Sequence, residues 1–115
     1  MILTRLPEQN LQDHGEYPFL HYQGSSYSNR RILDAANRLA SVLAAQGVKP
    51  GDRVVVCMPN RPEVFYSYQG VMRAGGIVIP VMFLLHPNEI GYIITDSDAR
   101  VVITSAGVLP SVLKA

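Results

Sequence analysis

Two kinds of hydrophobic pattern alternate along most of the chain. Between residues 29 and 46 the apolar side chains recur every three or four positions, which is typical of a helix with one buried face. They are Ile32, Leu33, Ala36, Leu39, Ala40 and Leu43. Residues 54–58, by contrast, are apolar without interruption and begin with three valines. Such a β-branched run predicts a central strand that helices cover on both faces.

The same alternation continues toward residue 80. A second helix is expected after Asn60, whose side chain can cap its start, with Glu63 three residues on as in a capping box. The predicted buried stripe of this helix is Val64, Phe65, Tyr68, Val71 and Met72. Gly75 and Gly76 end the helix, and residues 77–79 predict a second buried strand.

One more helix and strand complete the pattern. Pro87 is expected to open a third helix, with His86 capping its start. Its inward-facing residues are predicted to be Ile90, Ile93 and Ile94. Residues 101–103 predict the last strand, and residues 112–115 lie in what reads as the beginning of a further helix. We therefore expect the chain to be part of a larger protein.

Turn-forming residues set the boundaries in the first half of the chain. Residues 19–22 and 26–27 predict a small hairpin that turns at Gln23 and Gly24. Ser28 is well suited to cap the following helix, because its hydroxyl can accept from a free backbone N–H of the first turn. Gly47 supplies the left-handed residue that ends this helix, and residues 49–52 read as a tight turn.

The order of these elements predicts the fold class. A hairpin followed by alternating helices and strands with short connections indicates an α/β protein with a small, doubly wound, mostly parallel sheet. Residues 1–17 show little periodicity and are expected to form an N-terminal arm with at most one short helical turn. Residues 18–115 are expected to form a single α/β subdomain that is incomplete at its C-terminus.

Composition and charge exclude two broad classes of partner. Ten basic and nine acidic residues are scattered singly, for a net charge of +1, so no basic stripe is present to attract nucleic acid. The longest apolar run, residues 75–85, is interrupted by Pro80 and falls short of the roughly 20 residues that span a bilayer. We expect no membrane span, and the N-terminus does not read as a signal peptide. A cytoplasmic location is therefore expected.

The common catalytic and ligand-binding motifs are not found. The segment from Gly70 to Gly76 has the glycine spacing of a phosphate-binding loop, but it lacks the lysine and runs from a helix into a strand, so close packing at Gly70 explains it better. His14, His21 and His86 lie too far apart to suggest a metal site. Cys57, the single cysteine, lies in the apolar strand and reads as a buried hydrophobic residue. We assign no catalytic, cofactor-binding or metal-ligating residue in this chain.

Three segments stand out by their order and spacing. Tyr27-Ser28-Asn29 opens a helix, residues 47–56 combine a turn with a strand, and residues 73–80 combine a helix end with a strand. Each segment taken alone contains only residues that are common in turns and buried strands. In this order, however, the three segments resemble the N-terminal region of the adenylate-forming (AMP-binding) family. That family includes acyl- and aryl-CoA ligases, adenylation domains and luciferases, and the match looks closest to the acyl-CoA ligases. The likeness covers approximately residues 18–104.

The resemblance implies a function for a longer parent protein. Such enzymes use ATP and Mg²⁺ to convert a carboxylic acid, fatty or aromatic, into an acyl-adenylate, and then usually transfer the acyl group to coenzyme A. The family's phosphate-binding loop with its lysine, its acidic hinge and its C-terminal lysine have no counterpart in this sequence. The chain alone is therefore expected to need no cofactor, to be inactive, and to have the remainder of the parent chain as its partner.

One loop departs from the family pattern. The family commonly reads Pro-x-Asn-Pro after the strand, often followed by a basic residue, whereas here Pro80 is followed by Val81, Met82, Phe83 and Leu84. A direct contact of this loop with the nucleotide end of coenzyme A is therefore not expected, and the loop is expected to pack against apolar surface.

A second reading remains open on the sequence alone. The complete alternation of helices and strands also fits a stand-alone α/β module that binds or regulates without catalysis.

If the sheet is normally covered by other segments, the isolated chain exposes apolar surface or an unpaired strand edge, and copies of it are expected to associate.

Overall fold

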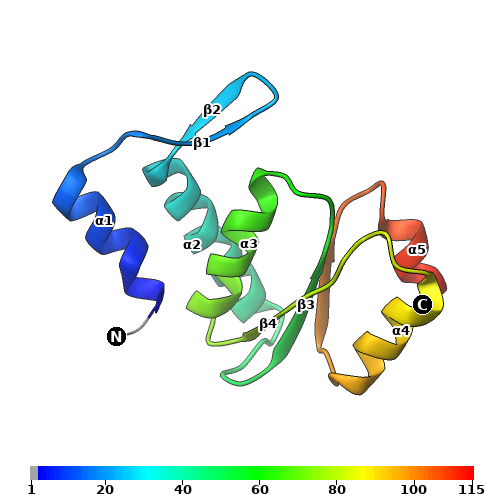
Figure 1. Ribbon diagram of the computed structural model, residues 1–115. Coiled ribbons are helices and arrows are strands. Elements are labelled where there is room, and N and C mark those ends of the chain that lie inside the picture. The colour runs from blue at the N-terminus through cyan, green and yellow to red at the C-terminus, as the bar shows by residue number, and fades with distance from the viewer. Residues whose placement is uncertain (1–2) are drawn as a thin grey trace.

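The computed structural model describes residues 3–115 and shows two separate sheets (Figure 1). A hairpin of β1 (Pro18–Tyr22) and β2 (Ser25–Ser28) lies apart from a three-stranded parallel sheet in the order β4-β3-β5. Those three strands are β3 (Arg53–Cys57), β4 (Ile77–Pro80) and β5 (Val101–Thr104). The helices are η1 (Leu3–Arg5), α1 (Leu6–His14), α2 (Asn29–Ala45), α3 (Pro62–Arg73), α4 (Pro87–Asp96) and α5 (Leu109–Lys114). The predicted α/β class is confirmed.

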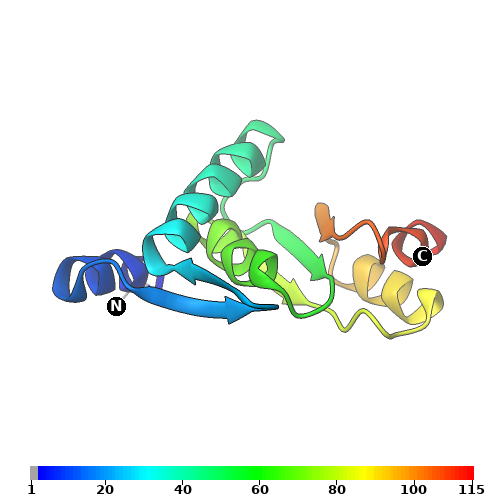
Figure 2. The same cartoon turned by 90° about the horizontal axis from the view of Figure 1, so that it is seen from above.

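The parallel sheet has helices on both faces. Figure 2 shows α2 and α3 on one side of β3 and α4 with α5 on the other. Successive residues of β3 point to opposite faces, so Val54 packs with Leu43 and Val71 on the first side, whereas Val55 packs with Ile90 on the second. Both valines are fully buried, as the uninterrupted apolar run predicted.

The two outer strands of the sheet are less buried than the central strand β3. β4 and β5 each pair with β3 alone within the described part of the chain, so both are edge strands. Residues of β5 are half-buried throughout, and the side chain of Ile77 in β4 is 46% exposed. The strand predicted at residues 77–79 is confirmed, but its predicted burial was wrong, because a hydrophobic run is compatible with either a central or an edge position.

The local signals around α2 are confirmed. The hairpin turns at Gln23 and Gly24, both of which have positive φ, as a tight two-residue turn requires. The hydroxyl of Ser28 accepts from the backbone N–H of Arg31 at 3.0 Å and caps α2. Gly47 follows the helix with φ of +92°, a left-handed conformation that glycine adopts without steric penalty.

The start and the buried face of α3 differ from the prediction. Arg61, not Asn60, is the N-cap residue, and no side chain caps this end; Glu63 pairs instead with the Arg61 guanidinium. Phe65 is nearly half exposed, whereas Ser67 and Gly70 are buried. The reason is close helix packing: a methyl group at Gly70 would lie 2.9 Å from Leu39 Cδ2 and 3.1 Å from the Ala36 carbonyl oxygen. The predicted close packing at Gly70 is thus confirmed.

The N-terminal segment is more regular than the expected arm with one turn. Residues 3–14 are helical, and α1 ends at Gly15, whose N–H donates to the Leu11 carbonyl at 2.9 Å. No residue of α1 is buried. Polar contacts with distant residues hold it in place, among them the pair between Glu8 and Arg73 of α3 and the hydrogen bond between Asn10 and Asn29. These contacts come from residues far away in sequence, so the local pattern of α1 gave no sign of them.

The second half of the fold follows the prediction. α4 begins at Pro87, and Ile90, Ile93 and Ile94 face the sheet. The side chain of His86 accepts from the Asn88 backbone N–H at 3.1 Å, so its predicted capping role is confirmed. Within residues 3–115, no helix has the length and apolar character needed to cross a bilayer.

Candidate functional site

The carboxyl edge of the parallel sheet is the place where this fold can build a site. In open α/β sheets, ligands bind in the crevice outside the carboxyl ends of the strands, because there the connecting loops diverge to opposite faces. Here β3 leads through α3 to β4 on one side, and the chain then returns through α4 to β5 on the other. The loops after Cys57, Pro80 and Thr104 therefore share one edge.

A groove of about 480 Å³ opens at this edge, between α3 and the loop after β4. We call it the carboxyl-edge groove. Its lining residues are Val56, Met58, Asn60, Val64, Tyr68, Pro80, Val81, Met82, Phe83 and Leu84. The Tyr68 hydroxyl and the Asn60 amide are its polar side-chain groups, and the remaining lining side chains are apolar. The volume lies in the range of small-molecule sites.

The loop after β4 forms one wall of the groove and is only partly packed. The N–H of Val81 donates to the Val56 carbonyl at 2.9 Å, so the loop leaves the sheet in register, and Val81 is buried. Met82 and Leu84 point away from the core and are 63% and 75% exposed. The expectation that this loop packs on apolar surface therefore holds for Val81 and not for these two residues.

The electrostatics of the groove do not favour an anion. None of its lining residues is cationic. The nearest cation along the chain, Arg61, lines an adjoining hollow and pairs with Glu63, which compensates its charge. A phosphate group here would lack the positive partners that phosphate sites use. The groove is chemically suited to apolar groups instead.

Cys57 lies at the end of β3, yet it is not positioned as a nucleophile. Its side chain is fully buried, and burial raises the pKa of the thiol above its ordinary value of 9.0. The Thr104 hydroxyl donates to the Cys57 backbone carbonyl at 2.7 Å and ties β5 to β3 at the carboxyl edge. The predicted role as a small buried hydrophobic residue is confirmed.

The burial of Cys57 gives a testable expectation. At pH 8 a thiol reagent should modify the folded chain at least about a hundredfold more slowly than the urea-unfolded chain, because reaction requires opening of the strand and a thiolate. Because the pKa of the Cys57 thiol is higher in the folded chain than in the unfolded chain, the thiol contributes stability that is complete below pH 9. This contribution is lost as the pH rises through the pKa of the folded state. The free energy of unfolding should therefore fall above pH 9, and less steeply in Cys57→Ala. Equal reaction rates in the folded and unfolded chains would contradict this account.

The other candidate residues are dispersed. His14 ends α1, His21 is exposed on β1 and His86 caps α4, and no cluster of three or more potential metal ligands occurs within residues 3–115. Tyr66 is half-buried in a hollow between α2 and the first turns of α3, and burial together with the Glu63 carboxylate raises the pKa of its phenol.

Sequence reasoning did not identify the groove itself. Tyr68 was expected in the buried stripe of α3, but it is half-buried and lines the carboxyl edge together with Asn60. The available signal was topological: Asn60 lies in the loop after β3 and Tyr68 in the helix that follows it. The alternation of strands and helices also places the ligand crevice of such a sheet outside the carboxyl ends of the strands.

The chain is similar in sequence to enzymes that are much longer than it is. The sequence model described as "AMP-binding enzyme" matches residues 7–115. A long-chain-fatty-acid–CoA ligase of Bacillus subtilis is 36% identical over 83% of the chain, and a linear gramicidin synthase of Brevibacillus parabrevis is 40% identical over 76%. The chain spans only 17% and 2% of the lengths of these two proteins.

A solved structure agrees with the fold over nearly the whole chain. The anthranilate CoA ligase AuaEII, crystallised in complex with anthranoyl-AMP, superimposes on 96% of the chain with a TM-score of 0.90 at 27% identity. The chain covers 21% of that protein. The arrangement of hairpin, helices and parallel sheet is therefore shared with about one fifth of a much longer polypeptide.

Proposed function

The chain belongs to the AMP-binding enzyme family, and from this membership we propose that the protein containing it is an ATP-dependent acyl-CoA ligase. In the proposed reaction a carboxylate attacks the α-phosphorus of ATP, forming an acyl-adenylate and releasing pyrophosphate. The thiol of coenzyme A then attacks the acyl carbon, forming a thioester and releasing AMP. The similarity to the Bacillus subtilis fatty-acid ligase across most of the chain is the observation that carries this proposal.

The carboxyl-edge groove does not fit the phosphates of ATP or coenzyme A. The carboxyl-edge groove has no cationic lining residue, and Arg61 beside it is engaged by Glu63. We therefore derive no phosphate-handling step from this chain. ATP, Mg²⁺, coenzyme A and a fatty or aromatic acid are proposed as ligands of the longer protein, bound mainly by its other segments.

The role that we propose for this chain is structural. It supplies a parallel sheet with helices on both faces, and it presents apolar side chains at the carboxyl edge, among them Met82 and Leu84. The remainder of the longer protein is the partner that we expect to cover them. Burial of exposed apolar surface of this kind is the main favourable term in such docking.

An exchange assay tests the proposal. The longest natural polypeptide containing residues 1–115 is incubated with ATP, Mg²⁺ and panels of fatty and aromatic acids, and acid-dependent exchange of labelled pyrophosphate into ATP is measured. We expect exchange with at least one acid and, after addition of coenzyme A, release of AMP with thioester formation. Exchange without any transfer to coenzyme A would favour an adenylation enzyme that loads a carrier protein, and no exchange with any acid would contradict the proposal.

The 115-residue chain is the matched control in this assay. It should give no acid-dependent exchange, because the groove offers no cationic group to stabilise the charge that develops on a phosphate. Turnover by the chain alone would contradict the structural role that we propose for it.

The isolated chain is also expected to associate with itself. Its edge strands β4 and β5 and the exposed Met82 and Leu84 offer unpaired backbone and apolar contacts to a second copy. Light scattering at rising protein concentration should show a growing apparent mass, and Met82→Lys with Leu84→Lys should reduce it. A sharp monomer at all concentrations would argue against this expectation.

A further inference from the structure

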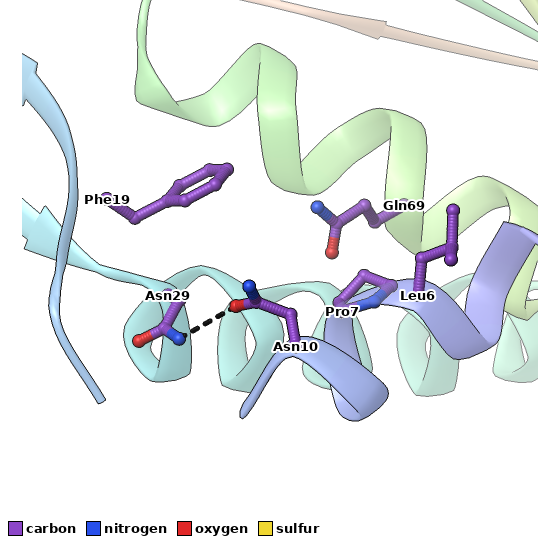
Figure 3. A pocket seen from close by; sticks show the side chains of 6 residues that line it. All are labelled: Leu6, Pro7, Asn10, Phe19, Asn29 and Gln69. Carbon is purple, nitrogen blue, oxygen red and sulfur yellow. Dashed lines mark hydrogen bonds between the residues drawn. The ribbon is translucent and has the colours of Figure 1, made fainter. Parts of the chain in front are cut away.

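A further hollow lies beside the N-terminal helix α1, where α1, β1, α2 and α3 meet. It has a volume of about 230 Å³ and is lined by Leu6, Pro7, Asn10, Phe19, Asn29 and Gln69. We call it the α1 pocket. Figure 3 shows that its walls come from α1, β1, α2 and α3, with Phe19 and Gln69 on one side and the residues of α1 on the other. It shares no lining residue with the carboxyl-edge groove.

Asn29 has no hydrogen-bonding capacity left for a ligand. Its amide nitrogen donates to Asn10 Oδ1 and to the Gly15 carbonyl, both at 3.0 Å. Its oxygen accepts from the backbone N–H groups of Tyr17 and Arg30. Asn10 in turn donates to the Tyr17 hydroxyl at 2.9 Å. These two residues therefore hold α1 and the chain after it against α2.

Gln69, unlike Asn29, has an acceptor that no residue in the described part of the chain uses. Its Oε1 atom is buried and accepts no hydrogen bond from residues 3–115. In Figure 3 the carboxamide extends from α3 toward α1 and into the pocket. A buried amide oxygen is normally satisfied, so an acceptor held in this way is suited to a donor that enters the pocket.

The remaining walls are apolar and include an aromatic rim. Leu6, Pro7 and Phe19 line the pocket, and the Phe19 ring lies edge-on to Phe65, with ring centroids 6.4 Å apart. Both phenylalanine side chains are nearly half exposed, so the rim is open to solvent. Aromatic edges and faces favour a further ring in this place. No lining residue carries a charge, and a neutral ligand is therefore favoured over an ionised one.

We propose that the α1 pocket binds a neutral single-ring aromatic molecule that carries one hydroxyl or N–H donor, with the donor on Gln69 Oε1. An apolar cavity of about 150 Å³ holds benzene, so a pocket of this volume can hold one ring with a small substituent. The ring occupies the space beside Phe19 and Leu6, and its donor satisfies the buried acceptor. This site is independent of the proposed ligase function and requires no nucleotide.

Phenol and toluene are the probes that test the proposal, because they share a ring and differ in the donor. Each is titrated into the ¹⁵N-labelled 115-residue chain and followed by amide chemical shifts. We expect phenol to shift the amides of α1, β1 and Gln69 and to bind about fivefold more tightly than toluene, the effect of one net hydrogen bond. In Gln69→Met, which keeps the side-chain length and removes the acceptor, this preference for phenol should disappear while toluene binding is retained.

Three results would contradict binding of phenol at Gln69. Equal affinity of the wild-type chain for phenol and toluene, or phenol shifts located away from the α1 pocket, would overturn the proposal. Retention of the phenol preference in a folded Gln69→Met variant would also overturn it. If that variant does not fold, the comparison of the two probes on the wild-type chain decides. Ligase activity enters neither measurement, so failure here is distinct from failure of the proposed function.

Discussion

Ile90→Ala should lower the free energy of unfolding of the chain by about 2–5 kcal/mol. Ile90 is 0% exposed and packs from α4 onto the sheet, in a cluster with Val55, Cys57 and Val81. Truncation to alanine removes buried methyl and methylene groups, and it leaves a cavity that neighbours on a strand and a helix cannot fully close. Urea unfolding followed by circular dichroism measures the change.

Ile77→Ala is the matched control for this prediction. It makes the same chemical change in β4, where the side chain is 46% exposed and lies at the sheet edge. The loss should be well under half of that for Ile90→Ala, because less apolar surface returns to water. Similar losses at the two positions would mean that the α4 side of the sheet is not a tightly packed core. The slope of the urea transition should stay constant if both variants unfold in the same way.

Asn29→Ala should have the second large effect, about 3 kcal/mol, and should release α1. The variant removes two donated and two accepted hydrogen bonds of one buried amide, and unsatisfied buried groups carry penalties of about 1–3 kcal/mol each. Because α1 itself buries no residue, these bonds and the contacts of Arg73 with Glu8 and the Thr4 carbonyl are its main attachments. Hydrogen exchange of the α1 amides should accelerate strongly, while that of β3 changes little.

Two further variants separate the parts of this effect. Asn29→Asp keeps the acceptor for the N–H groups of Tyr17 and Arg30 but loses both donated bonds, so it should fall between wild type and Asn29→Ala. Ser41→Ala changes an exposed polar residue of the same helix and should leave α1 exchange unaltered. Unchanged exchange of α1 in Asn29→Ala would show that other contacts hold this helix.

The apolar lining of the carboxyl-edge groove indicates which steps of the proposed reaction this chain does not carry out. A sheet edge with the topology of a ligand site is lined here by Met58, Val64 and Phe83, without a cation. Placement of phosphates depends on preorganised positive charge and donors. In the proposed ligase we therefore expect other segments to supply those groups, while this chain contributes a mainly apolar face at the carboxyl edge.

Much of the fold was predictable because its signals are local. The turn at Gly24, the Ser28 cap, the helix end at Gly47 and the cap at His86 each depend on the backbone geometry of a few adjacent residues, and all four were confirmed. The helical spacing in α2 and the unbroken apolar run of β3 likewise reflect periodicities of single elements. These features predicted the element types and the parallel α/β class.

The remaining features depend on contacts between residues that are distant along the chain. Whether a hydrophobic strand is central or at an edge is decided by its neighbours, so the exposure of Ile77 could not be read from residues 77–79. The docking of α1 depends on its hydrogen bond to Asn29. The lining of the carboxyl-edge groove depends on how the chain returns after β4. The burial of the Gln69 oxygen depends on all four elements that form the α1 pocket. Local patterns specify backbone conformation and amphipathic faces, but burial and cavity shape arise only when those faces meet.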